Sequence, residues 1–258
     1  MDPSKCHEPS SIFCILKIKN QEILYYRCMM RLMYEKFLEK YTPEEIIDCL
    51  SQFLTDSRKE KISSILSQRI SSVQIALESP VDIHNALAVV RSAEGLGVTN
   101  VHVIASKFKK SKGKNTTQGA HLWTDVFYHK TFTDFTKSTS FKVAAATLDT
   151  TNTLEDLPID ENICFLLGNE LKGLSDEACQ GADYRFKLPM FGFTQSFNLS
   201  VSAGIILYQF LQRKRKYLKK AGDLSEEKLL MEKAWYTILS LGIQKSDMIL
   251  KKLKPISS

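Results

Sequence analysis

The chain lacks the cysteine and histidine spacing of a metal-binding or disulfide-rich protein. Six cysteines are spread over 258 residues without a CxxC pair, and the five histidines show no metal-ligand pattern. Zinc sites and disulfide frameworks need closely spaced or paired ligands, so neither is expected to organise this chain. The composition indicates reduced thiols in a cytoplasmic protein that holds no metal.

A long hydrophobic run is also missing. The apolar run Ser11–Ile18 is too short and too interrupted for a signal peptide. No other stretch approaches the roughly 20 apolar residues that a membrane-spanning helix needs. The sequence therefore predicts a protein without a membrane span, located in the cytoplasm.

Three common active-site motifs are absent as well. The sequence contains no GxGxxG for dinucleotides, no GxxxxGKS or GxxxxGKT for nucleotide phosphates, and no GxSxG around a nucleophilic serine. A Rossmann dinucleotide site, a P-loop and the nucleophile elbow of α/β-hydrolases therefore have no support. An enzyme built on this chain must use another chemistry.

Positive charge is present in two clusters. The 35 Lys and Arg residues against 29 Asp and Glu give a net charge of +6. The clusters read KFKKSKGK at 107–114 and RKRKYLKK at 213–220. Either they are a solvated loop and a helix end whose cations suit the helix dipole, or they contact a phosphate backbone. The sequence leaves both interpretations open.

Both ends of the chain show helical spacing. Residues 1–72 carry almost no strand signal, and Thr42, Pro43 and Glu45 form the capping-box pattern of a helix start. Helical periodicity returns after residue 216, in the stretch LSEEKLLMEKAWYTIL. We therefore expect helical extensions at 1–72 and 217–258 around a central domain at 73–216.

Within the central domain, short β-rich apolar runs alternate with helical segments. The predicted strands are residues 73–78, 100–105, 124–129, 142–148, 162–168 and 184–189, and a long helix starts at Asn198. This alternation is typical of a mostly parallel sheet with helices on both faces. The predicted fold class is therefore α/β.

Glycines and polar residues follow three of these strands. The segments are SPVDIHNALAVVRSAEGLGV after residue 78, GNELKGLS after residue 167 and PMFGFTQSFNLSVSAG after residue 188. Ligands of parallel sheets bind beyond the carboxyl ends of the strands. We therefore predict that the three segments converge on one site.

The same segments resemble the three motifs of the SPOUT superfamily of RNA ribose methyltransferases. The matching stretches are HNALAVVRSAEGLGV, LLGNELKGLS and LPMFGFTQSFNLSVSAGIILY, in family order and at family-like separations. The match runs from about Val73 to Arg215, over half of the chain. Two further stretches, GAHLWTDVFYH and RKRKYLKKAGDLSEEKLLMEKAWY, are similar to the TrmH branch, the tRNA guanosine 2′-O-methyltransferases.

The resemblance implies a fold, a cofactor and an assembly. In the family, the C-terminal part of the domain forms a deep trefoil knot, an exception to the usual unknotted topology. Its loops hold S-adenosylmethionine (AdoMet), and two chains form a homodimer through the knot region. The implied activity is AdoMet-dependent 2′-O-methylation of a guanosine ribose in the D-loop of tRNA, without a metal.

The resemblance also assigns roles to residues. Arg91 is expected to activate the ribose 2′-hydroxyl. Because arginine is almost never deprotonated in a protein, orienting the hydroxyl and stabilising developing alkoxide charge is the alternative to a literal base. The other expected catalytic residues are Asn85, Glu170, Ser196 and Asn198. The expected cofactor contacts are Ala146, Leu167, Gly168, Leu188, Met190 and Phe197, and the expected RNA contacts are His84, Lys107, Lys109, Lys110, Arg213, Lys214 and Arg215.

Several positions carry more specific expectations. Gly168 and Gly192 should let the backbone approach closely or adopt a positive φ. Phe197 stands where relatives usually have Leu, and its larger ring is expected to reshape the adenosine slot while keeping it apolar. Leu122 stands where relatives often have a basic residue, which removes one expected phosphate contact.

Two other functions are compatible with the sequence. One keeps the chemistry and changes the substrate, to a guanosine of ribosomal RNA or another tRNA position. The other is a SPOUT-fold RNA-binding protein that has lost catalysis. The presence of all five expected catalytic residues argues against this second alternative, since a degenerate copy is expected to lose some of them.

Overall fold

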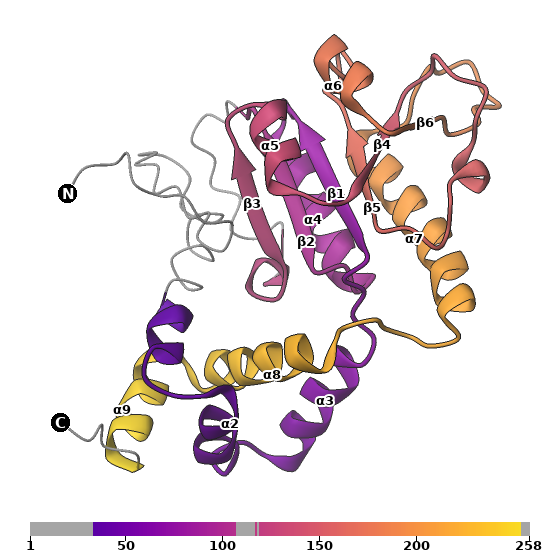
Figure 1. The fold of residues 1–258 in the computed structure, drawn as a ribbon. Helices are drawn as coiled ribbons and strands as arrows, with labels where there is room; N and C mark the ends of the chain where they lie inside the picture. Colours follow the sequence, from indigo (N-terminus) through magenta and orange to yellow (C-terminus); the bar gives the residue numbers. More distant parts are fainter. Residues whose placement is uncertain (1–32, 107–116, 118, 254–258) are drawn as a thin grey trace.

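The computed structural model describes residues 33–106, 117 and 119–253. The apolar run at 11–18 and the predicted RNA contacts Lys107, Lys109 and Lys110 lie outside the described residues. Figure 1 shows a sheet flanked by helices and, below it, a group of helices that come from both ends of the chain.

Six parallel strands form the sheet, in the order β3-β2-β1-β5-β4-β6. The central strand, β1, pairs Ile75 with Val101 of β2 on one side and with Phe165 of β5 on the other. The bounds are β1 Val73–Glu78, β2 Asn100–Ile104, β3 Asp125–His129, β4 Lys142–Ala146, β5 Ile163–Leu167 and β6 Tyr184–Phe186. All six predicted strands are present, and the predicted parallel sheet is confirmed.

Helices cover both faces of the sheet. On one face, α4 (Ile83–Gly95) and α7 (Leu199–Leu218) pack against each other and share a core with the alternate β1 residues Val73, Ile75 and Leu77. On the other face, α5 (Phe132–Ser138) and α6 (Asp176–Gly181) pack near Ala76 of the same strand. Every residue of β1 is buried, as expected for a parallel strand covered on two sides.

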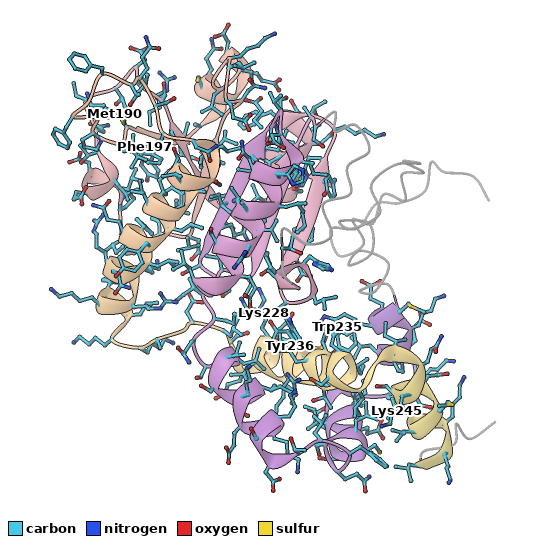
Figure 2. The ribbon with its side chains drawn as sticks, turned by 180° about the vertical axis from the view of Figure 1, so that it is seen from behind. Met190, Phe197, Lys228, Trp235, Tyr236 and Lys245 are labelled. Carbon is cyan, nitrogen blue, oxygen red and sulfur yellow. The ribbon has the colours of Figure 1, made fainter. Side chains whose placement is uncertain are left out.

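The helices below the sheet form a second core, here called the helical unit. It contains the helical residues 33–38, α2 (Pro43–Ser51), α3 (Asp56–Leu66), α8 (Glu226–Leu241) and α9 (Ile243–Leu253). Trp235 of α8, labelled in Figure 2, is fully buried in this core. Its ring centroid lies 5.1 Å from that of Tyr34, and the two rings are tilted by 32°. No helix in the described part of the chain is long and apolar enough to cross a membrane.

The predicted capping box starts α2. The Glu45 amide donates to the Thr42 hydroxyl at 3.2 Å, and the Thr42 amide donates to the Glu45 carboxylate at 3.0 Å. Pro43 occupies the first turn, where its missing N–H costs nothing. Local sequence alone therefore determines where this helix begins.

Arg69 joins the helical unit to the sheet. Its side chain is 1% exposed and donates to Glu94 at the end of α4, to the Trp123 carbonyl and to the Tyr236 hydroxyl of α8, over distances of 2.9–3.2 Å. The same Tyr236 hydroxyl donates to the Trp123 carbonyl at 3.0 Å. One buried guanidinium thus connects both ends of the chain with α4.

The segment before β3 completes this joint. The short 3₁₀ helix Ala120–Leu122 and the following Trp123 contact α4, and Leu122 and Trp123 pack against the core of the helical unit. A basic side chain at Leu122 would lose that contact, which explains the apolar residue at this position. A second 3₁₀ helix, Leu154–Asp156, lies in the connection between β4 and β5.

Candidate active site

The three motif segments meet at the carboxyl edge of the sheet, where all six parallel strands end. Asn85, in the first turn of α4, donates from Nδ2 to Oε1 of Glu170 over 3.0 Å. The Oδ1 of Asn85 accepts a 3.1 Å hydrogen bond from Nδ2 of Asn198, the residue before α7. One side chain from each segment joins this chain of hydrogen bonds, here called the Asn85 network. The predicted convergence of the three segments is confirmed.

The Glu170 carboxylate is held in its charged form by this network. Partial burial by itself would raise the pKa of Glu170, but hydrogen bonds from the Val81 amide, at 3.0 Å, and from Asn85 outweigh it and lower that pKa. Both carboxylate oxygens are therefore acceptors for α4 and its leading turn. In the part of the chain that the structure describes, no group of three His, Cys, Asp or Glu side chains is arranged to hold a metal.

Asn198 has two structural tasks. Its Oδ1 accepts from the Ser200 amide at 2.9 Å and from the Ser200 hydroxyl at 2.6 Å, so it caps the first turn of α7. Its Nδ2 donates to Oδ1 of Asn85. Ser196 lies two residues earlier in the exposed segment 191–198 and is not part of the Asn85 network.

Arg91 lies on the exposed face of α4. It is seven residues after His84, a spacing that puts both exposed side chains on one stripe of the helix. Asn85, six residues before Arg91, is about 9 Å away along the helix axis and on a neighbouring face. The ion pairs of the described residues do not include Arg91, whose side chain is exposed.

The predicted cofactor residues gather near the ends of β4, β5 and β6. Ala146 ends β4 opposite Phe186, and β4 lies between β6 and β5, which ends at Leu167. Leu188 packs partly buried against the core beside this edge. Figure 2 shows Met190 and Phe197 at the same end of the molecule, close to the start of α7. Ala146, Leu167 and Leu188 thus place apolar side chains at the ends of neighbouring strands.

The two glycines of this region behave differently. A Cβ on Gly168 would lie 2.3 Å from the carbonyl carbon of Gly173 and 2.4 Å from the Leu174 amide nitrogen, so only glycine fits. A Cβ on Gly192 would meet nothing within 4 Å, and its φ is not positive. Gly168 thus makes a close backbone approach, as predicted, whereas a positive φ is absent at Gly192 and its close approach to a ligand stays a prediction.

The predicted RNA contacts of α7 lie at the amino edge of the sheet, away from the Asn85 network. Lys214 is 2% exposed and donates to the carbonyls of Ile159 and Glu161 at 2.7 and 2.9 Å. Arg213 donates to the Leu154 carbonyl and Arg215 to the Leu96 carbonyl, both at 2.7 Å. These cations stabilise carbonyl groups of the fold. Burial leaves Lys214 with no surface for RNA, which corrects that prediction, whereas Arg213 and Arg215 are half-buried and remain predicted RNA contacts.

Two polar residues at the carboxyl edge belong to the site although no role was predicted for them. Glu78, the last residue of β1, accepts two hydrogen bonds from Ser175, and Asn169 donates from Nδ2 to the Ser79 carbonyl at 2.7 Å. The available signal was a charged residue ending an otherwise apolar strand. Such a residue is buried only when its charge is satisfied.

A family model also matches the central part of the chain. The model of the SpoU rRNA Methylase family matches residues 72–208. That match covers the six strands, the Asn85 network and the first half of α7.

Relatives of known activity and fold agree with this match. The tRNA (guanosine(18)-2′-O)-methyltransferase of Borreliella burgdorferi is 37% identical over 174 residues, which cover 66% of this chain and 80% of that protein. The A. aeolicus TrmH/SpoU tRNA modifying enzyme aligns with a TM-score of 0.62 and 26% identity, over 72% of this chain and 98% of that chain. The Streptomyces viridochromogenes SpoU methyltransferase AviRb, solved in complex with AdoMet, aligns with a TM-score of 0.52 and 19% identity, over 58% of this chain and 62% of that one, and shows the fold alone. Together with the geometry of the Asn85 network, these matches show that the chain belongs to the SpoU rRNA Methylase family, on its TrmH branch.

Proposed function

We propose that this protein transfers a methyl group from AdoMet to the ribose 2′-hydroxyl of a guanosine in the D-loop of tRNA, the guanosine 18 that names several relatives. The observation that carries the proposal is the Asn85 network. It draws Asn85, Glu170 and Asn198 from three distant segments to one edge of the sheet. All three are expected catalytic residues of the family that the chain belongs to.

The AdoMet site is proposed at the ends of β4, β5 and β6. Ala146, Leu167 and Leu188 supply apolar walls there, and Gly168 exposes main-chain groups that can recognise the edge of an adenine ring. Met190 and Phe197 lie at the same end of the molecule, near the start of α7. When bound, AdoMet supplies a methyl group that its sulfonium already activates.

Arg91 is the proposed catalytic residue. Its exposed guanidinium orients the ribose 2′-hydroxyl and stabilises the negative charge that develops on that oxygen during transfer. Asn85 and Glu170 hold the start of α4, and with it the helix that carries Arg91. Ser196 and Asn198 border the guanosine. Alignment of the hydroxyl with the methyl group supplies much of the rate.

A trefoil knot is proposed for the C-terminal part of the domain. The connection between β4 and β5, residues 147–162, binds the far end of α7 through Arg213 and Lys214. The chain leaves the edge strand β6 beside the same connection, where the Lys187 amide donates to the Asn152 carbonyl at 2.9 Å. It then reaches α4 on the face of the central strands. Passage through the loop at 147–162 would make this path a knot.

A homodimer and three domains complete the proposed architecture. The face of α7 that carries Val201 and Tyr208 is apolar and exposed, and Phe197 precedes it. Phe191, 98% exposed, and Phe193 extend this surface, and a second copy of the chain would bury it. The tRNA would then be reached across the interface. The proposed domains are the extensions 1–72 and 217–258, whose described helices form the helical unit, and the methyltransferase domain at 73–216.

The proposed RNA contacts are His84 and the lysine cluster at 107–114. His84 shares the exposed stripe of α4 with Arg91, so RNA that reaches the arginine also passes the histidine. We propose a cytoplasmic location for the reaction. The described cysteines, Cys49, Cys164 and Cys179, are free thiols, as a reducing compartment keeps them.

Methyl transfer from labelled AdoMet into an unmodified tRNA transcript tests the proposal. Ribosomal RNA is assayed in parallel, Arg91→Ala serves as the control, and the modified nucleotide is mapped. The expected result is label in the D-loop guanosine that is lost in the variant. Label only in ribosomal RNA would keep the mechanism and overturn the substrate. AdoMet binding without any transfer would indicate an RNA-binding protein.

A further inference from the structure

Two consecutive residues at the end of β1 hold both ends of the loop at residues 168–175. Glu78 is 7% exposed, and its carboxylate accepts hydrogen bonds from the Ser175 amide at 2.8 Å and from the Ser175 hydroxyl at 2.6 Å. The carbonyl of Ser79 accepts from Asn169 at 2.7 Å. Ser79 has a φ of 48°, which is rare for a residue other than glycine and directs its carbonyl toward the loop. The loop is thus fixed to one strand end at two points.

The loop itself is internally closed. Asn169 and Gly173 exchange two backbone hydrogen bonds of 2.9 Å, and Oδ1 of Asn169 accepts from the amides of Leu171 and Lys172 at 2.9 and 3.1 Å. Gly168 packs directly under Gly173, with no room for a side chain. A loop tied in this way moves as one body, so its position depends on its two attachments to β1.

The loop at 168–175 carries Glu170, the acidic residue of the Asn85 network. Glu170 lies between the two attachments and contacts Val81 and Asn85, which begin the path to Arg91. Because the Glu170 carboxylate accepts from Nδ2 of Asn85, it also fixes which end of that amide faces Asn198. If the loop were displaced, the side chain of Asn85 would change its orientation. The main chain at Gly168, where the loop begins, would also move.

We propose that Glu78 is a positioning residue for methyl transfer, which acts through Ser175 and the loop at 168–175 on Glu170 and Asn85. The inference rests on the proposed function. A buried carboxylate is costly unless its oxygens are satisfied, and Ser175 offers two donors that a single carboxylate can accept. A glutamine has the same shape, but its NH₂ group would face one of those donors.

The test compares Glu78→Gln, Ser175→Ala and Ser175→Thr in the full chain. For Glu78→Gln, we expect turnover to fall by about 10-fold to 10²-fold, since small displacements of reacting groups have effects of this size. We expect faster hydrogen exchange at the amides of Ser175, Leu171 and Lys172. Ser175→Ala keeps one of the two donors and should have an intermediate effect, whereas Ser175→Thr keeps both and should restore wild-type behaviour.

Glu161→Gln is the matched control. Its carboxylate also accepts from a hydroxyl, that of Tyr184 at 2.8 Å, but at the amino edge of the sheet. Turnover of Glu78→Gln within twofold of wild type, or reduced turnover with unchanged amide exchange, would overturn the proposal. If Glu78→Gln does not fold, the turnover and the amide exchange of Ser175→Ala are compared with those of Ser175→Thr, and the same outcomes decide. If the wild-type protein methylates no RNA, the proposed function fails, and amide exchange together with AdoMet binding by calorimetry still tests the attachment of the loop.

Discussion

The joint at the amino edge of the sheet and the candidate site at its carboxyl edge use similar polar residues in different ways. At the joint, Arg69 and Lys214 are almost fully buried and their donors reach carbonyl and hydroxyl groups of the fold. At the site, Arg91 is exposed without a described ion pair, and Phe191 projects into solvent. The buried cations Arg69 and Lys214 thus bind groups of the protein itself, while the described ion pairs do not include Arg91.

A cluster of cations in the sequence does not by itself mark an RNA surface. Arg213, Lys214 and Arg215 are consecutive in the chain, and each donates to carbonyls that loops and helix ends leave unpaired. Arg91 has no cationic neighbour in the sequence and lies exposed on its helix. The cations of α7 and Arg91 differ in how many hydrogen-bond acceptors surround them. That number depends on the fold and cannot be read from the sequence.

Replacing Arg69 should have the largest effect. In Arg69→Met, the carboxylate of Glu94, the Tyr236 hydroxyl and the Trp123 carbonyl lose their shared donor. We expect the free energy of unfolding to fall by about 3–5 kcal/mol, the usual cost of breaking a buried ion pair. Urea denaturation measures this change. Arg58→Met, at an exposed position of α3, is the matched control and should stay within about 0.5 kcal/mol of wild type.

Arg91→Ala should lower turnover and leave the stability of the protein unchanged. Turnover with tRNA is expected to fall by about 10²–10³-fold, the effect of losing one donor to a developing oxyanion. The melting temperature and the Kd for AdoMet should stay close to those of wild type, because Arg91 has no described ion-pair partner to lose. Single-turnover kinetics with calorimetric binding distinguish these quantities. Near-wild-type turnover in Arg91→Ala or Arg91→Lys would refute the assignment.

The sequence predicted most of the fold because its signals are local. Strand runs, the capping box at Thr42 and the three strand-end segments depend on neighbouring residues and on the rule that parallel strands end at one edge. The sequence predicted that the three segments converge. It could not predict which side chains form hydrogen bonds there, since residues 85, 170 and 198 are far apart in the chain.

The corrected predictions all depend on tertiary contacts. Lys214 is buried because the connection between β4 and β5 lies against α7, which no periodicity in α7 reveals. Gly168 and Gly192 look alike in sequence, and only the return of the chain at Gly173 makes one of them indispensable. The surroundings of Glu78 depend on Ser175, which lies 97 residues later in the chain and donates to its carboxylate.

This pair of glycines gives a third prediction, of moderate size. In Gly168→Ala the new methyl group overlaps the backbone at Gly173 and Leu174, so the loop at 168–175 must move. We expect a loss of about 1–3 kcal/mol in unfolding free energy, the usual effect of overpacking, together with weaker AdoMet binding. Gly192→Ala has open space and should change neither quantity measurably. Equal effects in the two variants would contradict the close approach at Gly168.

The smallest effect is expected from two histidines on the sheet. Nδ1 of His102 lies 3.0 Å from Nε2 of His129, and Nε2 of His102 lies 2.9 Å from Oε1 of Gln74. Burial, aided by the neighbouring His129, lowers the pKa of His102 to about 3. Burial also lowers the pKa of His129 to about 4, against the opposing effect of Asp134. The folded protein therefore holds both rings neutral at pH values where the unfolded chain protonates them.

The sign of the pH dependence follows from these lowered pKa values. Above about pH 6.5 both states carry neutral histidines, and the stabilisation is fully present; as the pH falls below 6.5, the unfolded chain takes up protons that the folded protein does not bind. Unfolding free energy should then decrease by on the order of 1 kcal/mol per pH unit for each histidine. Urea denaturation between pH 7.5 and 5.5 measures this slope above the range where carboxylates titrate. His102→Phe removes one titrating ring and should flatten the slope, so an identical slope in the variant would show that His102 takes up protons equally in the folded and unfolded states.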